Sequence, residues 1–279
     1  MLPAAAENAR AVSDTEGSGE GYLYRYRDLV GERAAWVREI ITDSRFYFSS
    51  PAAFNDPFDC QARFRVDDGL QARVRARARS VIDKVPMPRR ERRRITRLKV
   101  NPAKLLQDMT KEAREAIQKD IRVLSLSATH ENILMWSHYA NGHQGICLQF
   151  RLEADRGFFA GSQPVVYSAE LPVSAMMADD PMEPVDKLLL TKAKDWEYEC
   201  EWRLIHQDGV SAVMFPPELL TGVILGAKIS SAHRELIAEW ARARTAPLTV
   251  YAADLDSKRF GLSFRKLYTV PTQTNPGER

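Results

Sequence analysis

Three glutamates at alternate positions, Glu197, Glu199 and Glu201, lie in the stretch "KAKDWEYECEWRLIHQDG" and are followed by Arg203. If this stretch is a strand, alternate side chains lie on one face, and the three carboxylates share that face. Like charges arranged in this way repel one another unless a cation lies opposite. Two interpretations follow: a solvated strand edge balanced by nearby cations, or a face turned toward a ligand that develops positive charge.

Three further clusters hold polar side chains that core packing does not explain: "YRYR", "FSSPAAFNDPFD" and "MWSHYANGHQG". Strand alternation places Arg25 and Arg27 on one face, where they either line a site or extend over a solvated surface. Asn55 and Asp56 precede a proline, which indicates a turn; they could also stand at the mouth of a pocket. His143 follows an expected helix end, where core packing competes with a role in a pocket.

Taken in order, these clusters resemble the signature of a bacterial family designated domain of unknown function 2971. The most specific pieces are "FNDPFD", "MWSHYANGHQGI" and "WEYECEWRL", and the resemblance extends from Tyr22 to about Tyr268. The family carries no established activity, so this resemblance implies a fold relationship and leaves the function open.

The same order of residues is similar, more distantly, to the ADP-ribosyltransferase superfamily, whose pattern is Arg or His, then Ser or Tyr, then Glu. Matched by position, the pattern falls on Arg25 or Arg27, on Ser49 with Ser50, and on Glu199 and Glu201. The resemblance implies that Arg25 holds a phosphate of NAD and that Ser49 orients the ribose. It also implies that Glu201 stabilises the ribosyl cation left when nicotinamide departs, and that Glu199 assists the acceptor.

This resemblance makes NAD, consumed as a substrate, the expected cofactor. The expected NAD-binding residues are Arg27, Tyr47, Ser50, Phe54, Asn55, Asp56, Tyr139 and His143. Either Tyr47 or Phe54 would be the ring that stacks on nicotinamide. No metal site is expected under this hypothesis.

A basic segment suggests the partner. From Gln71 to Lys104, about a dozen cationic side chains accompany only Asp83 and Glu91. Such a segment is either a solvated helical face or a surface that binds a polyanion by releasing counterions. We therefore expect the Arg73–Arg97 region to contact a nucleic acid, which would be the acceptor if the protein is an enzyme such as a toxin or phage-defence effector.

Two alternatives come from other functional classes. The first is a non-enzymatic nucleic-acid-binding or sensing module that uses the basic segment for phosphates and aromatic rings for stacking. The second is a metal-dependent nuclease with Asp56, Glu199, Glu201 and His143 around magnesium.

The elements that would position these residues predict an α+β protein with a mixed, largely antiparallel sheet. Strands are expected at Tyr22–Arg27, Arg45–Ser49, "IRVLSLSA", "QGICLQFRL", "PVVYSA", "YECEWRLI", "TGVILGAKI", "LTVYAADL" and "GLSFRKL". Helices are expected at "LVGERAAWVREIITDS", "ENILMWSHYANGH", "PVDKLLLTKAKD" and "SAHRELIAEWARAR". An ADP-ribosyltransferase-like core is what the more distant resemblance implies.

The 279 residues fit one α+β domain over residues 21–270, with a helical, arginine-rich insertion at residues 70–119. Prolines at "VPMPRR" and "VNPAK" should break that insertion into separate helices. Residues 1–20 are expected to be a disordered tail, because they lack the basic start and apolar core of a secretory signal. Residues 271–279 are expected to form a second tail.

The cysteines and the hydropathy point to the compartment. Cys60, Cys147 and Cys200 lie far apart without paired spacing, which favours reduced thiols in the cytoplasm and argues against a zinc site. No apolar run approaches the length of a membrane span, so no membrane partner is expected.

Overall fold

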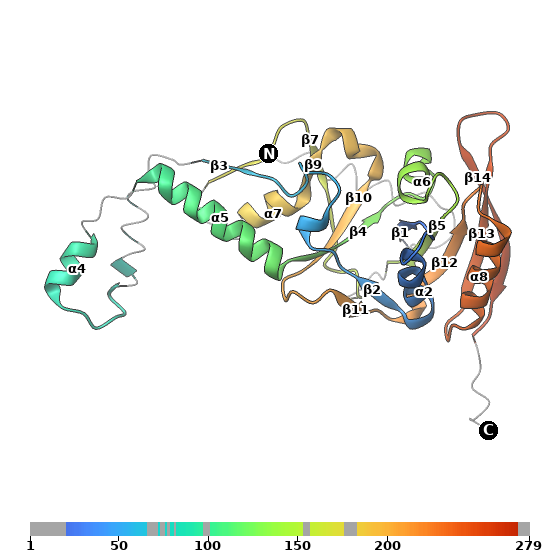
Figure 1. Cartoon of the computed structure of the whole chain (residues 1–279), viewed down its shortest axis with the longest axis horizontal. Coiled ribbons are helices and arrows are strands. Elements are labelled where there is room, and N and C mark those ends of the chain that lie inside the picture. The colour runs from blue at the N-terminus through green and yellow to red at the C-terminus, as the bar shows by residue number, and fades with distance from the viewer. Residues whose placement is uncertain are drawn as a thin grey trace, which may run out of the picture.

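The computed structural model describes residues 21–65, 82–96, 101–152, 157–175 and 183–272, together with residues 72, 76, 79 and 80 (Figure 1). The predicted tail at residues 1–20, most of the tail at residues 271–279, and Arg73 and Arg97 of the basic segment lie outside these ranges. None of the helices described within them has the length and apolar character needed to cross a bilayer.

An eight-stranded sheet forms the body of the protein, in the order β14-β13-β12-β5-β1-β4-β10-β6. The strands are β1 (Tyr22–Arg27), β4 (Arg122–Ser127), β5 (Ile146–Arg151), β6 (Gln163–Pro164), β10 (Glu201–His206), β12 (Leu220–Leu225), β13 (Leu248–Leu255) and β14 (Leu262–Val270). The β12–β13 pair is parallel, and the other neighbours in the sheet are antiparallel. The predicted α+β class with a mixed, largely antiparallel sheet is confirmed.

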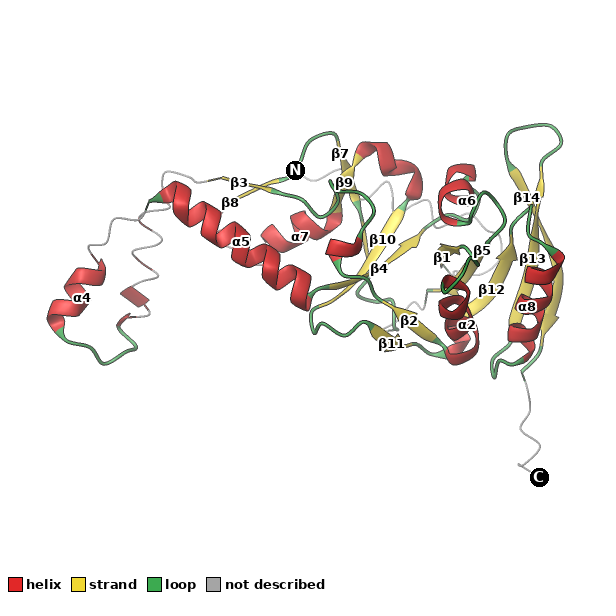
Figure 2. Cartoon of the chain, in the orientation of Figure 1, coloured by secondary structure: helices red, strands yellow, loops and turns green. Residues whose placement is uncertain are grey.

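Helices and small two-stranded sheets surround this body (Figure 2). The helices are α2 (Arg33–Asp43), α4 (Arg89–Thr96), α5 (Pro102–Asp120), α6 (Ile133–Tyr139), α7 (Glu183–Leu190) and α8 (Ser231–Arg242), with 3-10 turns η2 (Pro51–Ala53), η3 (Lys194–Glu199) and η4 (Pro217–Leu219). The small sheets pair β2 (Arg45–Tyr47) with β11 (Ala212–Met214), β3 (Arg63–Arg65) with β8 (Val173–Ala175), and β7 (Val166–Ser168) with β9 (Thr191–Ala193).

Strand periodicity divides the core between the two faces of the sheet. On β1, Leu23 belongs to the large hydrophobic cluster that also contains Ile41 of α2 and Ile237 of α8. The adjacent Tyr24 belongs to a second cluster with Trp136 of α6. Because successive side chains of a strand point to opposite faces, α2 and α8 cover one face and α6 covers the other.

Helices α4 and α5 lie within the predicted basic insertion and follow the prolines as expected. Helix α4 begins at Arg89, directly after "VPMP", and α5 begins at Pro102. Proline is tolerated in the first turn of a helix, where its missing N–H has no intrahelical partner. In Figure 1, α5 extends away from the sheet and α4 lies at its far end.

The predicted strand "YECEWRLI" is wrong in its first half. Residues up to Glu199 form the 3-10 turn η3, Cys200 adopts a left-handed conformation with φ of 45°, and the strand begins at Glu201. The three alternating glutamates therefore do not share one strand face: Glu197 is exposed, whereas Glu199 and Glu201 are buried. The alternating pattern fits a strand, but the local backbone turns before the sheet begins.

Several other predicted elements are shorter than expected. The helix predicted over "PVDKLLLTKAKD" ends at Leu190, and β9 and η3 take its place from Thr191 onward. The strand predicted at Arg45–Ser49 ends at Tyr47, and Ser49 instead forms an isolated antiparallel bridge with Val123. The helix predicted over "ENILMWSHYANGH" spans only Ile133–Tyr139. Asn132 caps its start by accepting hydrogen bonds from two backbone amides, and Asn141 and Gly142 have positive φ just beyond its end.

Candidate functional site

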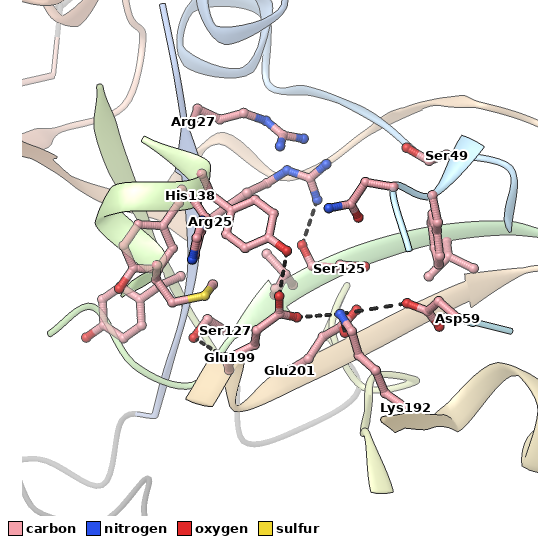
Figure 3. A pocket seen from close by; sticks show the side chains of 18 of the residues that line it. Arg25, Arg27, Ser49, Asp59, Ser125, Ser127, His138, Lys192, Glu199 and Glu201 are labelled. Atoms are coloured by element: carbon pink, nitrogen blue, oxygen red, sulfur yellow. Dashed lines mark hydrogen bonds and ion pairs between the residues drawn. The ribbon is translucent and has the colours of Figure 1, made fainter. Parts of the chain in front are cut away.

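A pocket of about 490 Å³ opens between β1 and β4 (Figure 3). The two strands pair at a single register position, Tyr24 with Ser127, whereas β1 pairs with β5 along its whole length. Because β1 and β4 separate beyond that position, the sheet splits, and side chains from both strands line the gap. Phe54 and Asn55 from the loop after η2, Tyr139 of α6, Lys192 of β9, Glu199 of η3 and Glu201 of β10 also contribute to the lining.

Arg25 forms the cationic wall of the pocket together with Arg27. The Arg25 side chain is 7% exposed, and its Nη1 donates a 2.8 Å hydrogen bond to the backbone carbonyl of Ser125 on β4. This bond satisfies a β4 carbonyl across the split. Arg25 Nε has no hydrogen-bond partner among the described residues.

A buried guanidinium with so few partners favours an anionic ligand. Burial lowers the pKa of Arg25 well below its usual value, and burial also lowers the pKa of Arg27 to about 10. Desolvation therefore penalises both charges. An anion placed between them would offset that penalty, since a buried charge is stable when it is paired and hydrogen-bonded.

The acidic floor of the pocket is centred on the ammonium group of Lys192. Lys192 Nζ donates a short hydrogen bond to Glu199 Oε2 and a 2.9 Å bond to Glu201 Oε2, and it lies 3.7 Å from Asp59 Oδ2. All four side chains are buried. The attraction of the carboxylates raises the pKa of Lys192 in spite of its burial, so this cation is retained at neutral pH.

Arg203 holds the back of the floor and is fully buried. Its Nε donates to Glu201 Oε1 at 2.8 Å, and its Nη2 donates to both oxygens of Asp59, at 2.9 and 2.7 Å. Its Nη1 donates to the Leu189 carbonyl at 2.6 Å. Three carboxylates against Lys192 and Arg203 leave one net negative charge on the floor when all are ionised.

Neighbouring segments hold the two glutamates in place. The Ser127 hydroxyl donates a 2.7 Å hydrogen bond to the backbone carbonyl of Glu199, and the Glu201 amide donates to the Tyr167 hydroxyl at 2.7 Å. The Tyr139 hydroxyl donates to Glu199 Oε1 at 2.5 Å. The side chain of Glu199 is thus fixed from α6 on one side and from β9 on the other.

The pKa values of the two glutamates are displaced in opposite directions. Burial is the largest influence on Glu199 and raises its pKa. Burial also acts on Glu201, but Arg203 and Lys192 outweigh it and lower the pKa to about 2. Glu201 is therefore a permanent anion, whereas Glu199 is the group better suited to accept and return a proton.

The structure brings together eight of the predicted site residues. All four predicted catalytic residues line the pocket with four of the predicted NAD-binding residues: Arg25, Ser49, Glu199, Glu201, Arg27, Phe54, Asn55 and Tyr139. Ser49 is exposed at the rim, and Phe54 stacks on the guanidinium of Arg203 at 5.3 Å. Segments far apart in the chain thus meet at one pocket.

Four other predicted NAD-binding residues do not line this pocket. The Tyr47 hydroxyl donates to Glu39 at 2.6 Å, and Ser50 caps η2. Asp56 accepts a hydrogen bond from the Phe58 amide and closes the expected turn, although Phe58 is exposed rather than part of the core. His143 stacks on Trp136 with a centroid distance of 6.2 Å.

The hypothetical magnesium site of a nuclease is not assembled. Asp56 and His143 lie outside the pocket, and the Lys192 ammonium occupies the position toward which Asp59, Glu199 and Glu201 converge. Among the described residues, no group of three or more His, Cys, Asp or Glu side chains is arranged to hold a metal ion.

The pocket also contains residues that were not predicted as site residues, among them Ser125, Asp59 and Lys192. The alternation in "RVLSLS" could have suggested that Ser125 and Ser127 share a strand face, but which strand lies opposite is a tertiary question. As one of the nearby cations of the solvated-edge interpretation, Lys192 is expected on the surface, whereas the structure buries it. Its burial depends on β9 bringing it to Glu201 at the start of β10, which no local pattern reveals.

Comparison with known proteins identifies one relationship. Residues 135–204 match the family model described as "Protein of unknown function (DUF2971)". The match supports the predicted family over this segment and does not cover the rest of the predicted range, Tyr22 to about Tyr268. The match begins in α6, ends in β10 and includes Tyr139, Lys192 and both pocket glutamates of this DUF2971 segment. Neither the curated proteins nor the solved structures gave a match to the chain.

Proposed function

We propose that the pocket binds NAD and that the protein transfers ADP-ribose to a macromolecular acceptor. The observation that carries the proposal is the opposition of a cationic wall, the buried Arg25 and the half-buried Arg27, to a buried acidic floor, Glu199 and Glu201. A dinucleotide presents phosphates to the first and sugar hydroxyls to the second. An ADP-ribosyltransferase-like core is part of the same proposal.

The chemistry would be divided between the two glutamates. The bond between nicotinamide and the ribose breaks, nicotinamide leaves with the bonding electrons, and positive charge develops on the sugar. Glu201, held ionised by Arg203 and Lys192, stabilises that charge. A nucleophilic group of the acceptor attacks the sugar carbon, and Glu199 takes its proton as general base.

The remaining groups would orient the substrate. Arg25 and Arg27 would hold the phosphates, and Ser49 at the rim would contact the ribose. Of the two predicted stacking rings, Phe54 is the one that lines the pocket. Tyr47, the other stacking candidate, is hydrogen-bonded to Glu39 outside the lining. The carbonyl-bound Arg25 needs no rearrangement to face a ligand, which lowers the cost of binding.

A nucleic acid is the acceptor that the charge distribution favours. Among the described residues from Arg79 to Arg94, five arginines lie in α4 alone, and Asp83 and Glu91 are the acidic residues of that stretch. Non-enzymatic nucleic-acid binding is the second candidate function, and it rests on α4 without requiring the pocket.

The first test is NAD consumption by the purified protein. Wild type should release nicotinamide, and Glu201→Gln should lower the rate by at least about 100-fold, because it removes the anion facing the developing charge. Glu197→Gln is the matched control, since Glu197 lies in the same stretch but is exposed; it should leave the rate unchanged.

A second variant, Glu199→Gln, keeps the test decisive if Glu201→Gln does not fold. Glu199→Gln neutralises the glutamate whose ionised form burial already disfavours, so it should fold, as circular dichroism can verify. It should reduce transfer to an acceptor. A wild-type protein that neither binds nor cleaves NAD would refute the proposal, and magnesium-dependent cutting of nucleic acid would favour the nuclease instead.

A further inference from the structure

Four arginines of α4 gather on one side of the helix. Arg89, Arg90, Arg93 and Arg94 line a single hollow of about 570 Å³, and these four are its described lining residues. Their spacing of one, four and five positions brings them to one helix face, because residues four apart in a helix are neighbours. We call this surface the arginine face.

Repulsion within the arginine face lowers the stability of α4 as an isolated helix. Arg89 with Arg93 and Arg90 with Arg94 are like-charged pairs four residues apart, which destabilise a helix. Helix α4 has only eight residues, fewer than a helix needs for stability in water by itself. A bound polyanion would relieve this repulsion and release its own counterions.

The composition of α4 favours phosphates over a lipid bilayer. The helix reads "RRERRRIT", in which Ile95 is the one large apolar residue and is only half-buried. A helix that lies in a membrane interface inserts a broad apolar face, and α4 has none. Its cations are all arginines, whose planar guanidinium matches phosphate oxygens in a bidentate manner.

Helix α5 connects the arginine face to the pocket. It has 19 residues and, at 1.5 Å per residue, is roughly 28 Å long. It ends at Asp120, next to β4, which lines the pocket. The Ser50 hydroxyl donates to the Gln118 carbonyl at 3.2 Å, so the end of α5 is tied to the loop that carries Phe54 and Asn55.

We propose that the arginine face docks the sugar–phosphate backbone of a nucleic acid and that α5 sets the distance from this docking site to the pocket. Docking of the nucleic acid on the arginine face does not depend on the proposed enzymatic function. The second step rests on the proposed function and deepens it, because it places the acceptor: the length of α5 alone, roughly 28 Å, corresponds to about eight base pairs of duplex. Under this proposal, a docked duplex shorter than α5 does not reach the pocket.

Fluorescence anisotropy with the full-length protein tests docking. The probes are a labelled 30-base-pair DNA duplex and one of its strands, titrated between 50 and 200 mM salt. Four phosphate contacts predict that a plot of the logarithm of the binding constant against the logarithm of the salt concentration has a slope of about −3.6 for the duplex and about −2.8 for the single strand. Those contacts alone account for an affinity loss of about 150-fold and 50-fold over this range.

A charge-matched variant supplies the control. Changing Arg89, Arg90, Arg93 and Arg94 to Gln should flatten the salt slope by those amounts and weaken binding at 50 mM salt. The control changes Arg234, Arg242, Arg259 and Arg265 to Gln. These lie on α8 and on the hairpin of β13 and β14, at the opposite end of the molecule in Figure 1. The control carries the same net charge and should retain the slope.

Several results would overturn docking by α4. Equal slopes for the two quadruple variants would show that net charge alone drives binding. Equal affinity for vesicles of anionic phospholipid, or competition by polyglutamate as effective as that by DNA, would point to a different partner. Either result excludes a site that recognises a nucleic-acid backbone.

The two proposals fail separately. Salt-dependent DNA binding without NAD cleavage would reject the enzymatic function and keep the docking site. NAD cleavage with DNA binding unaffected by the α4 variant would do the reverse. If wild type labels DNA, a 20-base-pair duplex should be labelled faster than a 6-base-pair duplex, and the α4 variant should lose this difference; an unchanged ratio would reject the spacing role of α5.

Discussion

At the scale of the residue, burial tends to raise the pKa of both Glu199 and Glu201, and their different partners give the two carboxylates opposite net shifts. Glu201 accepts from Arg203 and Lys192, and its pKa falls to about 2. Glu199 accepts from Lys192 and Tyr139, a neutral donor, and its pKa stays above the usual value. Glu199 has one charged partner fewer than Glu201, and this difference shifts the pKa values of the two neighbouring carboxylates in opposite directions.

This difference predicts how stability depends on pH. Because the pKa of Glu201 is lowered from 4.5 to about 2, its stabilisation is present above pH 4.5 and is lost as the pH falls toward 2. Glu201→Gln should therefore lower the free energy of unfolding by about 3 kcal/mol at pH 7. The deficit should shrink as the pH falls below 4.5, as urea unfolding can measure.

Glu199→Gln is the comparison for this measurement. Because the pKa of Glu199 is raised, its contribution to stability depends on pH in the opposite way. The contribution is greatest below the pKa of the unfolded state and is lost as the pH rises through the pKa of the folded state. The cost of this variant at pH 7 should be the smaller of the two. Equal costs, or a Glu201→Gln deficit that stays constant from pH 7 to pH 3, would contradict the assignment.

At the scale of the element, the pocket depends on how β1 is held against β5. The Cβ of an alanine at position 145 would lie 2.2 Å from the backbone carbonyl oxygen of Arg27, at the end of β1. Only glycine permits this approach. The close contact fixes the strand that carries Arg25, while the opposite side of β1 separates from β4.

Gly145→Ala should therefore displace the end of β1. We expect a loss of about 1–3 kcal/mol in the free energy of unfolding, because backbone must move to relieve the overlap. Gly222→Ala is the matched control: its nearest neighbour would be the side-chain oxygen of Gln149 at 2.4 Å, which can rotate away. Chemical denaturation of both variants checks this prediction, and a larger loss for Gly222→Ala would count against it.

At the scale of the whole molecule, the pocket exists only when distant segments assemble. Its lining comes from β1, α2, η2 and the loops on either side of it, β4, α6, β9, η3 and β10. The unfolded chain cannot reproduce this arrangement, so a ligand of the pocket must bind the folded state alone and stabilise it by mass action.

Thermal unfolding with ADP-ribose tests this linkage. At a ligand concentration 100 times Kd, the stabilisation is about 2.7 kcal/mol, which corresponds to a rise in Tm of roughly 5–10 °C. Arg25→Gln should abolish the rise, whereas Arg38→Gln, on the exposed side of α2, should preserve it. No change in Tm for wild type, or an equal rise for Arg25→Gln, would show that the cationic wall does not hold phosphate.

The sequence by itself determined the features that depend on local periodicity. Strand alternation placed Arg25 and Arg27 together, and the helical spacing of Val37 and Ile41 located α2. The prolines of the basic segment marked the starts of α4 and α5. These features can be predicted because the spacing of apolar residues within one helix or strand indicates which of its faces is buried.

Tertiary structure alone decided which of those faces became a site. Glu199 and Glu201 leave the common strand face because the chain turns at Cys200, and Ser127, 72 positions from Glu199, holds that turn. Lys192 became the centre of the acidic floor because β9 brings it within hydrogen-bond distance of Glu199 and Glu201. Contacts between distant segments depend on which strands become neighbours, and no local pattern encodes that choice.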